Sequence, residues 1–217
     1  VWGVLLLIAG VSFQVVGAVS SERFLQGISL ILILWGGSLY LGGIKFAKYL
    51  FVPIGYLFFM FPIPSIIWNR FSFLMKLYAS DVAVSLIQAI VSIPIMKEGN
   101  IIHLTSGSLE VADACSGLRS LISMLAMGVL VAFISRYSLW KRITLLIMAI
   151  PIAIAANILR LVITVILADQ YGVSVADGFI HTYSGILVFI LGFIMLLSIH
   201  LFFNGTTAHR TEGANDH

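Results

Sequence analysis

Long apolar runs alternate with short polar segments along most of the chain. Six segments are almost entirely apolar: 2–19, 24–44, 46–61, 117–135, 139–168 and 183–203. A helix of about 20 such residues spans the roughly 30 Å hydrocarbon core of a bilayer. The third segment is short and contains Pro53. The pattern predicts an all-α fold, a polytopic transmembrane helix bundle of about six spans.

Two segments depart from this pattern. Between 65 and 94, polar residues recur at steps of three and four, which predicts an amphipathic helix that lies along the membrane interface or lines a bundle. They comprise Asn69, Ser72, Lys76, Ser80, Asp81, Ser85, Gln88 and Ser92. Segments 100–104 and 109–112 alternate around the turn Thr105-Ser-Gly-Ser108, which predicts a short extracytoplasmic β-hairpin.

Composition agrees with a membrane protein. Hydrophobic residues make up 60% of 217 positions and charged residues 10%, with a mean hydropathy of +1.10, whereas soluble domains carry about 25% charge. The net charge of +3 reflects loop charges rather than nucleic-acid binding. We expect a single transmembrane domain over 1–203 and a disordered polar tail over 204–217. Because the first residue is Val1, we also expect a fragment or a trimmed product.

Basic residues predict the orientation. They cluster in turns that would lie on one side of the membrane: Lys45, Lys48, Arg136, Lys141, Arg142 and Arg210. Cytoplasmic loops are enriched in Lys and Arg, so these turns are expected inside. Arg23, Arg70, Lys76 and Lys97 then fall outside, so the argument depends on clustering rather than on the count. Cys115 and His181, which precede the fourth and sixth spans, are then extracytoplasmic.

Arg160 is expected at the same membrane depth as these two residues. It lies 18 residues beyond Arg142, about 27 Å along a helix and close to the full hydrocarbon thickness. An arginine in an apolar segment is expensive unless paired or hydrated, so it marks a functional site by default. Pairing with Asp169 or Asp177 is the structural alternative.

Cysteine, arginine and histidine at one interface make chemical sense together. A thiolate is the nucleophilic form of Cys115, and a helix N-terminus or a nearby guanidinium lowers the pKa of a thiol from about 8.5. The guanidinium of Arg160 could stabilise an oxyanion, and His181 could transfer the proton that amide departure needs. Taken singly, Cys115 could be an inert small hydrophobe, His181 an interfacial polar residue, and Arg119 an outer-face anchor.

Three motifs carry a resemblance to a known family. Glu110-Val-Ala-Asp-Ala-Cys115-Ser-Gly-Leu-Arg119-Ser-Leu resembles the cysteine motif of the exosortase/archaeosortase family, Ala156-Asn157-Ile-Leu-Arg160 its arginine motif, and His181-Thr-Tyr-Ser-Gly185 its histidine motif. Lys97-Glu-Gly-Asn-Ile-Ile and Phe61-Pro-Ile-Pro64 resemble further family segments in the same order. The resemblance covers about 51–203, and the histidine motif favours the bacterial exosortase branch.

The resemblance implies a cysteine transpeptidase or protease of the cell (inner or plasma) membrane. Its partners would be exported proteins with a C-terminal sorting signal of the PEP-CTERM type, which consists of a short motif, a membrane helix and a basic cluster, together with membrane lipid and no nucleic acid. It implies Cys115 as nucleophile, with Arg160 and His181 as the other catalytic residues, and Arg119 and Asn157 are candidate supporting residues. No cofactor and no metal are expected. Family members usually have about eight spans, so two N-terminal helices are expected to be missing.

Two other functions remain open. A small transporter or channel would use Arg160 to bind an anion and leave Cys115 inert, and it predicts polar residues at mid-depth of several spans. A membrane thiol acyltransferase would use the same cysteine on an acyl donor. Only the identity of the substrate separates the acyltransferase from the transpeptidase.

Overall fold

The computed structural model describes residues 1–91, 94–111, 116–135, 138–173 and 181–212, the last range without the side chains of 181–182 and 204–212. It is 83% helical, which confirms the predicted helical fold. The chain divides into two compact units, Val1–Asn69 and Arg70–His217, and each is described by itself.

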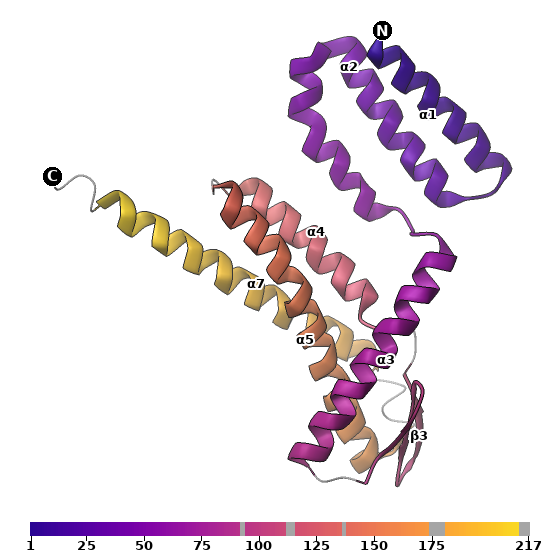
Figure 1. Cartoon of the computed structure of the whole chain (residues 1–217), viewed down its shortest axis with the longest axis vertical. Coiled ribbons are helices and arrows are strands. Elements are labelled where there is room, and N and C mark those ends of the chain that lie inside the picture. Colours follow the sequence, from indigo (N-terminus) through magenta and orange to yellow (C-terminus); the bar gives the residue numbers. More distant parts are fainter. Residues whose placement is uncertain (92–93, 112–115, 136–137, 174–180, 213–217) are drawn as a thin grey trace. The chain divides into compact units, whose positions relative to one another are not determined.

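The first unit consists of α1 (Trp2–Val19), α2 (Arg23–Tyr56) and a 3₁₀ turn, η1 (Leu57–Met60). Helix α2 is interrupted at Gly43, whose φ of 71° and ψ of −175° are not helical, and the chain folds back there (Figure 1). The predicted segments 24–44 and 46–61 are therefore two arms on either side of this break. Lys45 and Lys48 are exposed just after it, as a basic turn between two spans would be.

Glycines allow α1 and α2 to pack backbone to backbone. Gly3, Gly10 and Gly17 recur every seven residues of α1 and are buried. A Cβ on Gly36 of α2 would lie 2.9 Å from the backbone nitrogen of Leu7, which is closer than real Cβ atoms approach. Small residues at such positions are what permits close helix pairing where lipid supplies no hydrophobic driving force.

The second unit contains three helices that pack on one another: α4 (Leu118–Ile134), α5 (Leu139–Tyr171) and α7 (His181–Glu212). Ala132 of α4 and Leu196 of α7 share a buried cluster with Leu145, Ala149 and Ile152 of α5. Helix α7 continues through Glu212 and so extends into the segment 204–212 that was predicted to be disordered. A single glycine such as Gly205 lowers helix propensity by about 1 kcal/mol, which is too little to end a long helix. Residues 213–217 lie outside the described part of the chain.

The second unit also contains a small antiparallel sheet of β1 (Met96–Glu98), β2 (Ile101–Leu104) and β3 (Gly107–Glu110), in that order. The predicted hairpin is confirmed as β2–β3, but β3 begins at Gly107, inside the expected turn. Strand β1 was not predicted because its three residues include Lys97 and Glu98 and show no apolar alternation. Gly99, with a φ of 62°, provides the tight turn between β1 and β2.

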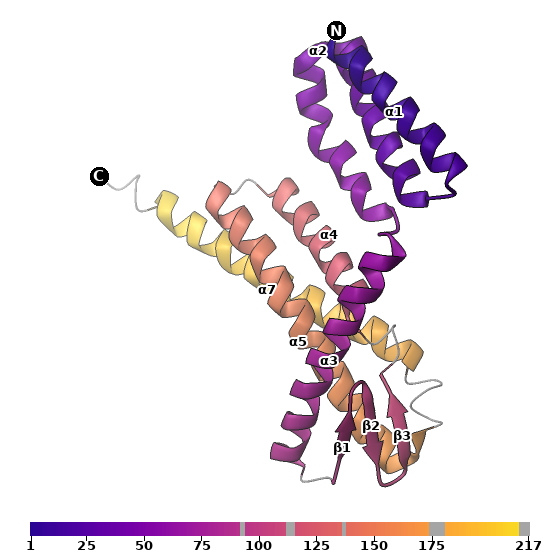
Figure 2. The same ribbon diagram turned by 45° about the vertical axis from the view of Figure 1, so that its right-hand side comes forward.

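Helix α3 (Ser65–Ile90) packs against this sheet and against α5, as Figure 2 shows. Its predicted polar stripe divides into two edges. Ser72, Lys76 and Ser80, spaced by four, are buried, whereas Asp81 and Ser85 are exposed. The helix thus turns polar groups inward, as expected of a helix that lines a bundle.

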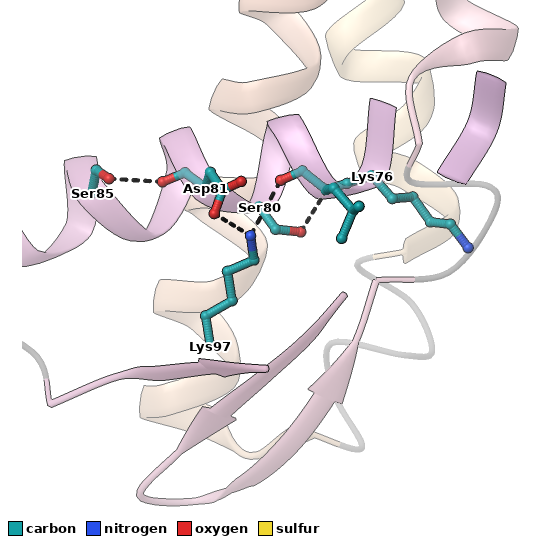
Figure 3. A network of polar contacts seen from close by, with 6 residues as sticks. Lys76, Ser80, Asp81, Ser85 and Lys97 are labelled. Atoms are coloured by element: carbon teal, nitrogen blue, oxygen red, sulfur yellow. Dashed lines mark hydrogen bonds and ion pairs between the residues drawn. The ribbon is translucent and has the colours of Figure 1, made fainter. Parts of the chain in front are cut away.

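Polar contacts fix the sheet to both neighbouring helices. Lys97 of β1 forms an ion pair with Asp81 of α3 and donates to the Leu77 carbonyl at 3.4 Å (Figure 3). On the other side, Thr105 Oγ1 donates to Asp169 Oδ1 of α5 at 2.9 Å. Ile102 lies in the apolar cluster between them and is fully buried. Because an exposed ion pair contributes at most about 1 kcal/mol, the apolar cluster is the main attachment.

Within the described residues, five helices are long and apolar enough to cross a membrane: Trp2–Val19, Arg23–Met60, Ser65–Ile90, Leu139–Tyr171 and Tyr183–Phe203. This count takes both arms of α2 as one helix and omits α4, whose 17 residues span about 26 Å. It includes α3, which the sequence pattern assigned to the interface or to a bundle lining. The chain is a polytopic helical membrane protein.

Candidate active site

The start of α4 is fixed against the middle of α5. Gly117 caps α4 in the left-handed conformation, with a φ of 80° and a ψ of −5°. A Cβ at this position would lie 2.6 Å from both Cγ and Nδ2 of Asn157. Asn157 itself is 2% exposed. The turn that follows Cys115 therefore rests directly on the Asn157 side chain, and only glycine satisfies both the backbone angle and the available space.

Ser116 and Ser120 complete the local structure of this turn. The buried Ser116 hydroxyl accepts from the Leu118 backbone N–H at 3.4 Å, and Ser120 Oγ donates to the Gly117 carbonyl at 2.8 Å. Ser116 thereby satisfies one of the backbone N–H groups that a helix leaves open at its start. Ser120 shares the Gly117 carbonyl with the Leu121 backbone N–H, which donates to it at 2.8 Å. Residues Ser116 to Ser120 thus fold as a compact entry to α4.

Arg160 lies one helical turn after Asn157 on α5 and contacts the first turns of α7. It is 8% exposed, and its Nε donates to Ser184 Oγ at 3.0 Å. A Cβ on Gly185 would lie 3.9 Å from each of Cζ, Nη1 and Nη2 of Arg160. A point equally far from these three atoms lies over the flat side of the guanidinium, so Gly185 covers that face.

The described parts of the three sequence motifs therefore meet on α5. Asn157 and Arg160 are three residues apart, so they lie on one face of the helix. Asn157 contacts Gly117 of the cysteine motif, and Arg160 contacts Ser184 and Gly185 of the histidine motif. The 18-residue spacing between Arg142 and Arg160 predicted that Cys115, Arg160 and His181 lie at one membrane depth, and that depth stays a prediction.

The predicted catalytic residues are described to different extents. Cys115 lies outside the described residues, two positions before Gly117. His181 is the first residue of α7, three positions before Ser184, and its side chain is outside the described part. The proximity of the three reactive side chains thus stays a prediction. Arg119, a candidate supporting residue, is exposed in the first turn of α4.

Asp169 does not explain the burial of Arg160. The two residues are nine positions apart on α5, about 14 Å along the helix axis. The Asp169 carboxylate accepts from Thr105 at the tip of the β2–β3 hairpin. Asp177, the other acidic residue that could pair with Arg160, lies outside the described residues.

The opposite end of the three-helix bundle carries basic residues. Arg142 Nη2 donates to the Ser135 carbonyl at 3.0 Å, and Lys141 Nζ donates to the Phe203 carbonyl at 3.0 Å. His200 Nδ1 lies 3.2 Å from Ser135 Oγ. Lys141 and Arg142, two of the basic residues used to predict orientation, therefore lie at the far end of α5 from Arg160.

Comparison with protein families gives the decisive finding. Residues 1–198 match the family described as transmembrane exosortase (Exosortase_EpsH). The chain belongs to the transmembrane exosortase family. Comparisons with curated proteins and with solved structures give no match. The match extends the resemblance, which the motifs carried over about 51–203, to the N-terminal unit of this exosortase family member.

Two contacts of this exosortase site were not predicted from the sequence. Ser184 and Gly185 belong to the histidine motif but were not singled out. Position 184 is three residues after His181, and residues at this spacing share a helix face, so this spacing is the signal by which Ser184 could have been found. No sequence signal indicated that Gly117 rests on Asn157, because the two residues are 40 positions apart.

Proposed function

We propose that this exosortase family member is a membrane cysteine transpeptidase or protease. It cleaves C-terminal sorting signals of exported proteins at the outer face of the cell membrane, through a thioacyl-enzyme on Cys115. The observation that carries the proposal is the meeting of the three motifs on one face of α5, where Asn157 contacts Gly117 and Arg160 contacts Ser184.

Each residue has a defined role in the proposed reaction. The Cys115 thiolate attacks the scissile carbonyl carbon, and the carbonyl electron pair moves to oxygen. The Arg160 guanidinium stabilises this oxyanion. When the carbon–oxygen double bond re-forms, the carbon–nitrogen bond breaks and His181 gives its proton to the departing amine. The thioester then reacts with water or an amine, His181 takes the proton of that nucleophile, and the thiolate leaves.

Burial makes Arg160 suited to this role. A guanidinium stays charged under all physiological conditions, and a charge that is shielded from water acts more strongly on a developing oxyanion than an exposed one. Arg160 is 8% exposed, and its Nε donates to Ser184 Oγ at 3.0 Å. A group that is already oriented needs no rearrangement when charge develops.

The bilayer supplies the remaining advantage. A substrate with a C-terminal membrane helix would lie beside the enzyme in the same membrane, so its scissile segment is fixed at one depth. Attack then becomes effectively intramolecular, which contributes up to about 7–11 kcal/mol for well-oriented groups.

The proposal is tested with a reporter that carries a short C-terminal motif, a membrane helix and a basic cluster from an exported protein of the same cell. Cys115→Ala is expected to abolish processing while the protein stays in the membrane, and Cys115→Ser to retain little activity because a hydroxyl needs a stronger base. Exposed Ser198→Ala on α7 is the matched control and should process normally. Processing by Cys115→Ala at a rate near that of the unchanged chain would refute the thiol mechanism.

A further inference from the structure

We propose that Ser184 is a positioning residue, whose hydroxyl holds the guanidinium of Arg160 in the orientation that the reaction at Cys115 requires. The inference rests on the proposed function, because it assigns Ser184 a task only if Arg160 acts on the reacting groups. It adds to the cysteine, arginine and histidine triad a residue that acts through the arginine.

The geometry of the contact favours positioning over simple packing. Ser184 Oγ accepts from Nε of Arg160 at 3.0 Å, within the usual range for an N–H···O bond. Nε is the guanidinium donor nearest the side-chain stem, so a bond there fixes how the planar group rotates about its last bonds. Gly185 lies over the flat side of the same group, where even a Cβ would stay 3.9 Å from Cζ, Nη1 and Nη2, so the start of α7 approaches that side without a clash.

The contact also joins two elements of the site. Arg160 is on α5, and Ser184 is in the first turn of α7, three residues after His181. A hydrogen bond to a charged group is roughly twice as strong as a neutral one. The same bond therefore orients the guanidinium of Arg160 and fixes the first turn of α7, the helix that begins at His181.

Ser184→Ala should therefore weaken catalysis without unfolding the chain. Loss of one hydrogen bond to a charged group predicts a fall of about 10-fold to 100-fold in processing per folded molecule. Ser184→Thr keeps the hydroxyl and should retain most of the activity. Ser198 of the same helix is exposed and donates from Oγ to the Ile194 carbonyl in its own helix at 2.8 Å. It is the control, and Ser198→Ala should process normally.

A second readout needs no processing substrate. Cys115 is the only cysteine in the chain, so its alkylation by iodoacetamide, measured against pH in the full-length protein, reports on that thiol alone. Arg160→Lys and Ser184→Ala should both slow alkylation at pH 7, because a guanidinium that is lost or misplaced leaves less thiolate. At pH values below the pKa of the Cys115 thiol, a rise of one unit in that pKa leaves about 10-fold less thiolate and slows alkylation accordingly. In an Arg160→Lys background, Ser184→Ala should slow alkylation little further, because lysine lacks the guanidinium Nε–H that Ser184 accepts from.

The outcomes separate the two proposals. If Arg160→Lys slows alkylation and processing but Ser184→Ala changes neither, the positioning role is wrong and the proposed function stands. If Ser184→Ala and Arg160→Lys lose activity additively, Ser184 acts independently of Arg160 and the inference is overturned. If Arg160→Lys leaves both readouts unchanged, the catalytic role of Arg160 fails and the role of Ser184 fails with it.

Discussion

Gly117→Ala probes the contact between the cysteine motif and α5 most sharply. The substitution has two effects that the structure separates. Alanine must adopt a φ of 80°, which costs an L-residue about 1–2 kcal/mol. Its Cβ would also lie 2.6 Å from Cγ and Nδ2 of the buried Asn157, and forcing extra atoms into a packed site costs about 1–3 kcal/mol. Gly117→Ala is therefore expected to lower the free energy of unfolding by about 2–5 kcal/mol in total.

Gly99→Ala is the matched control for the backbone term. Gly99 has a similar φ of 62°, but nothing lies within 4 Å of a Cβ built there. Gly99→Ala should therefore lower the free energy of unfolding by only about 1–2 kcal/mol. Thermal unfolding of the detergent-solubilised chain measures the difference, since 1 kcal/mol shifts the Tm of a protein of this size by about 2–4 °C.

Asn157→Ala in the Gly117→Ala background tests the contact itself. It removes Cγ and Nδ2 but leaves the Asn157 Cβ, which is 2.9 Å from the position of a Cβ built on Gly117. The double variant should therefore recover part of the steric loss and none of the backbone loss, which appears as a coupling energy between the two substitutions. Equal destabilisation by Gly117→Ala and Gly99→Ala, with no coupling to Asn157, would refute the packing of this turn on α5.

Two further predictions concern topology and the N-terminal unit. An impermeant thiol reagent should label Cys115 in right-side-out vesicles, and labelling confined to inside-out vesicles would overturn the proposed orientation. Gly36→Ala should destabilise the chain by about 1–3 kcal/mol, because its Cβ would meet the Leu7 backbone at 2.9 Å. Gly37→Ala, which meets nothing within 4 Å, should be neutral or stabilise by about 0.5–1 kcal/mol, and equal effects of the two would contradict the close α1–α2 packing.

The helices were predictable because each apolar run is read from neighbouring residues. Hydropathy located α1, both arms of α2, α4, α5 and α7, and the basic turn at Lys45 and Lys48 marked the break in α2. Helix rise alone predicts how far Arg160 lies from Arg142 along α5, and its depth in the membrane stays a prediction. Strand β1 was missed because its pairing with β2, rather than any pattern in its own three residues, makes it a strand.

The contacts of the site were less predictable. Whether Arg160 bonds to Ser184, or Asn157 supports Gly117, depends on how α4, α5 and α7 rotate against one another. Spacing along one helix fixes which residues share a face but not which neighbour that face meets. The motifs indicated which segments form the site, but the packing of the helices determines which residues contact one another.

The central claim is a covalent acyl-enzyme on Cys115, and mass spectrometry of the trapped enzyme tests it most directly. The full-length enzyme is incubated with the reporter, quenched in acid to preserve the thioester, and digested to locate any added mass. The account predicts the mass of the reporter fragment upstream of the cleavage site on the peptide that contains Cys115, removable by hydroxylamine and absent in Cys115→Ala. Cleaved reporter with no adduct on Cys115 at any quench time, or an adduct on another residue, would contradict it.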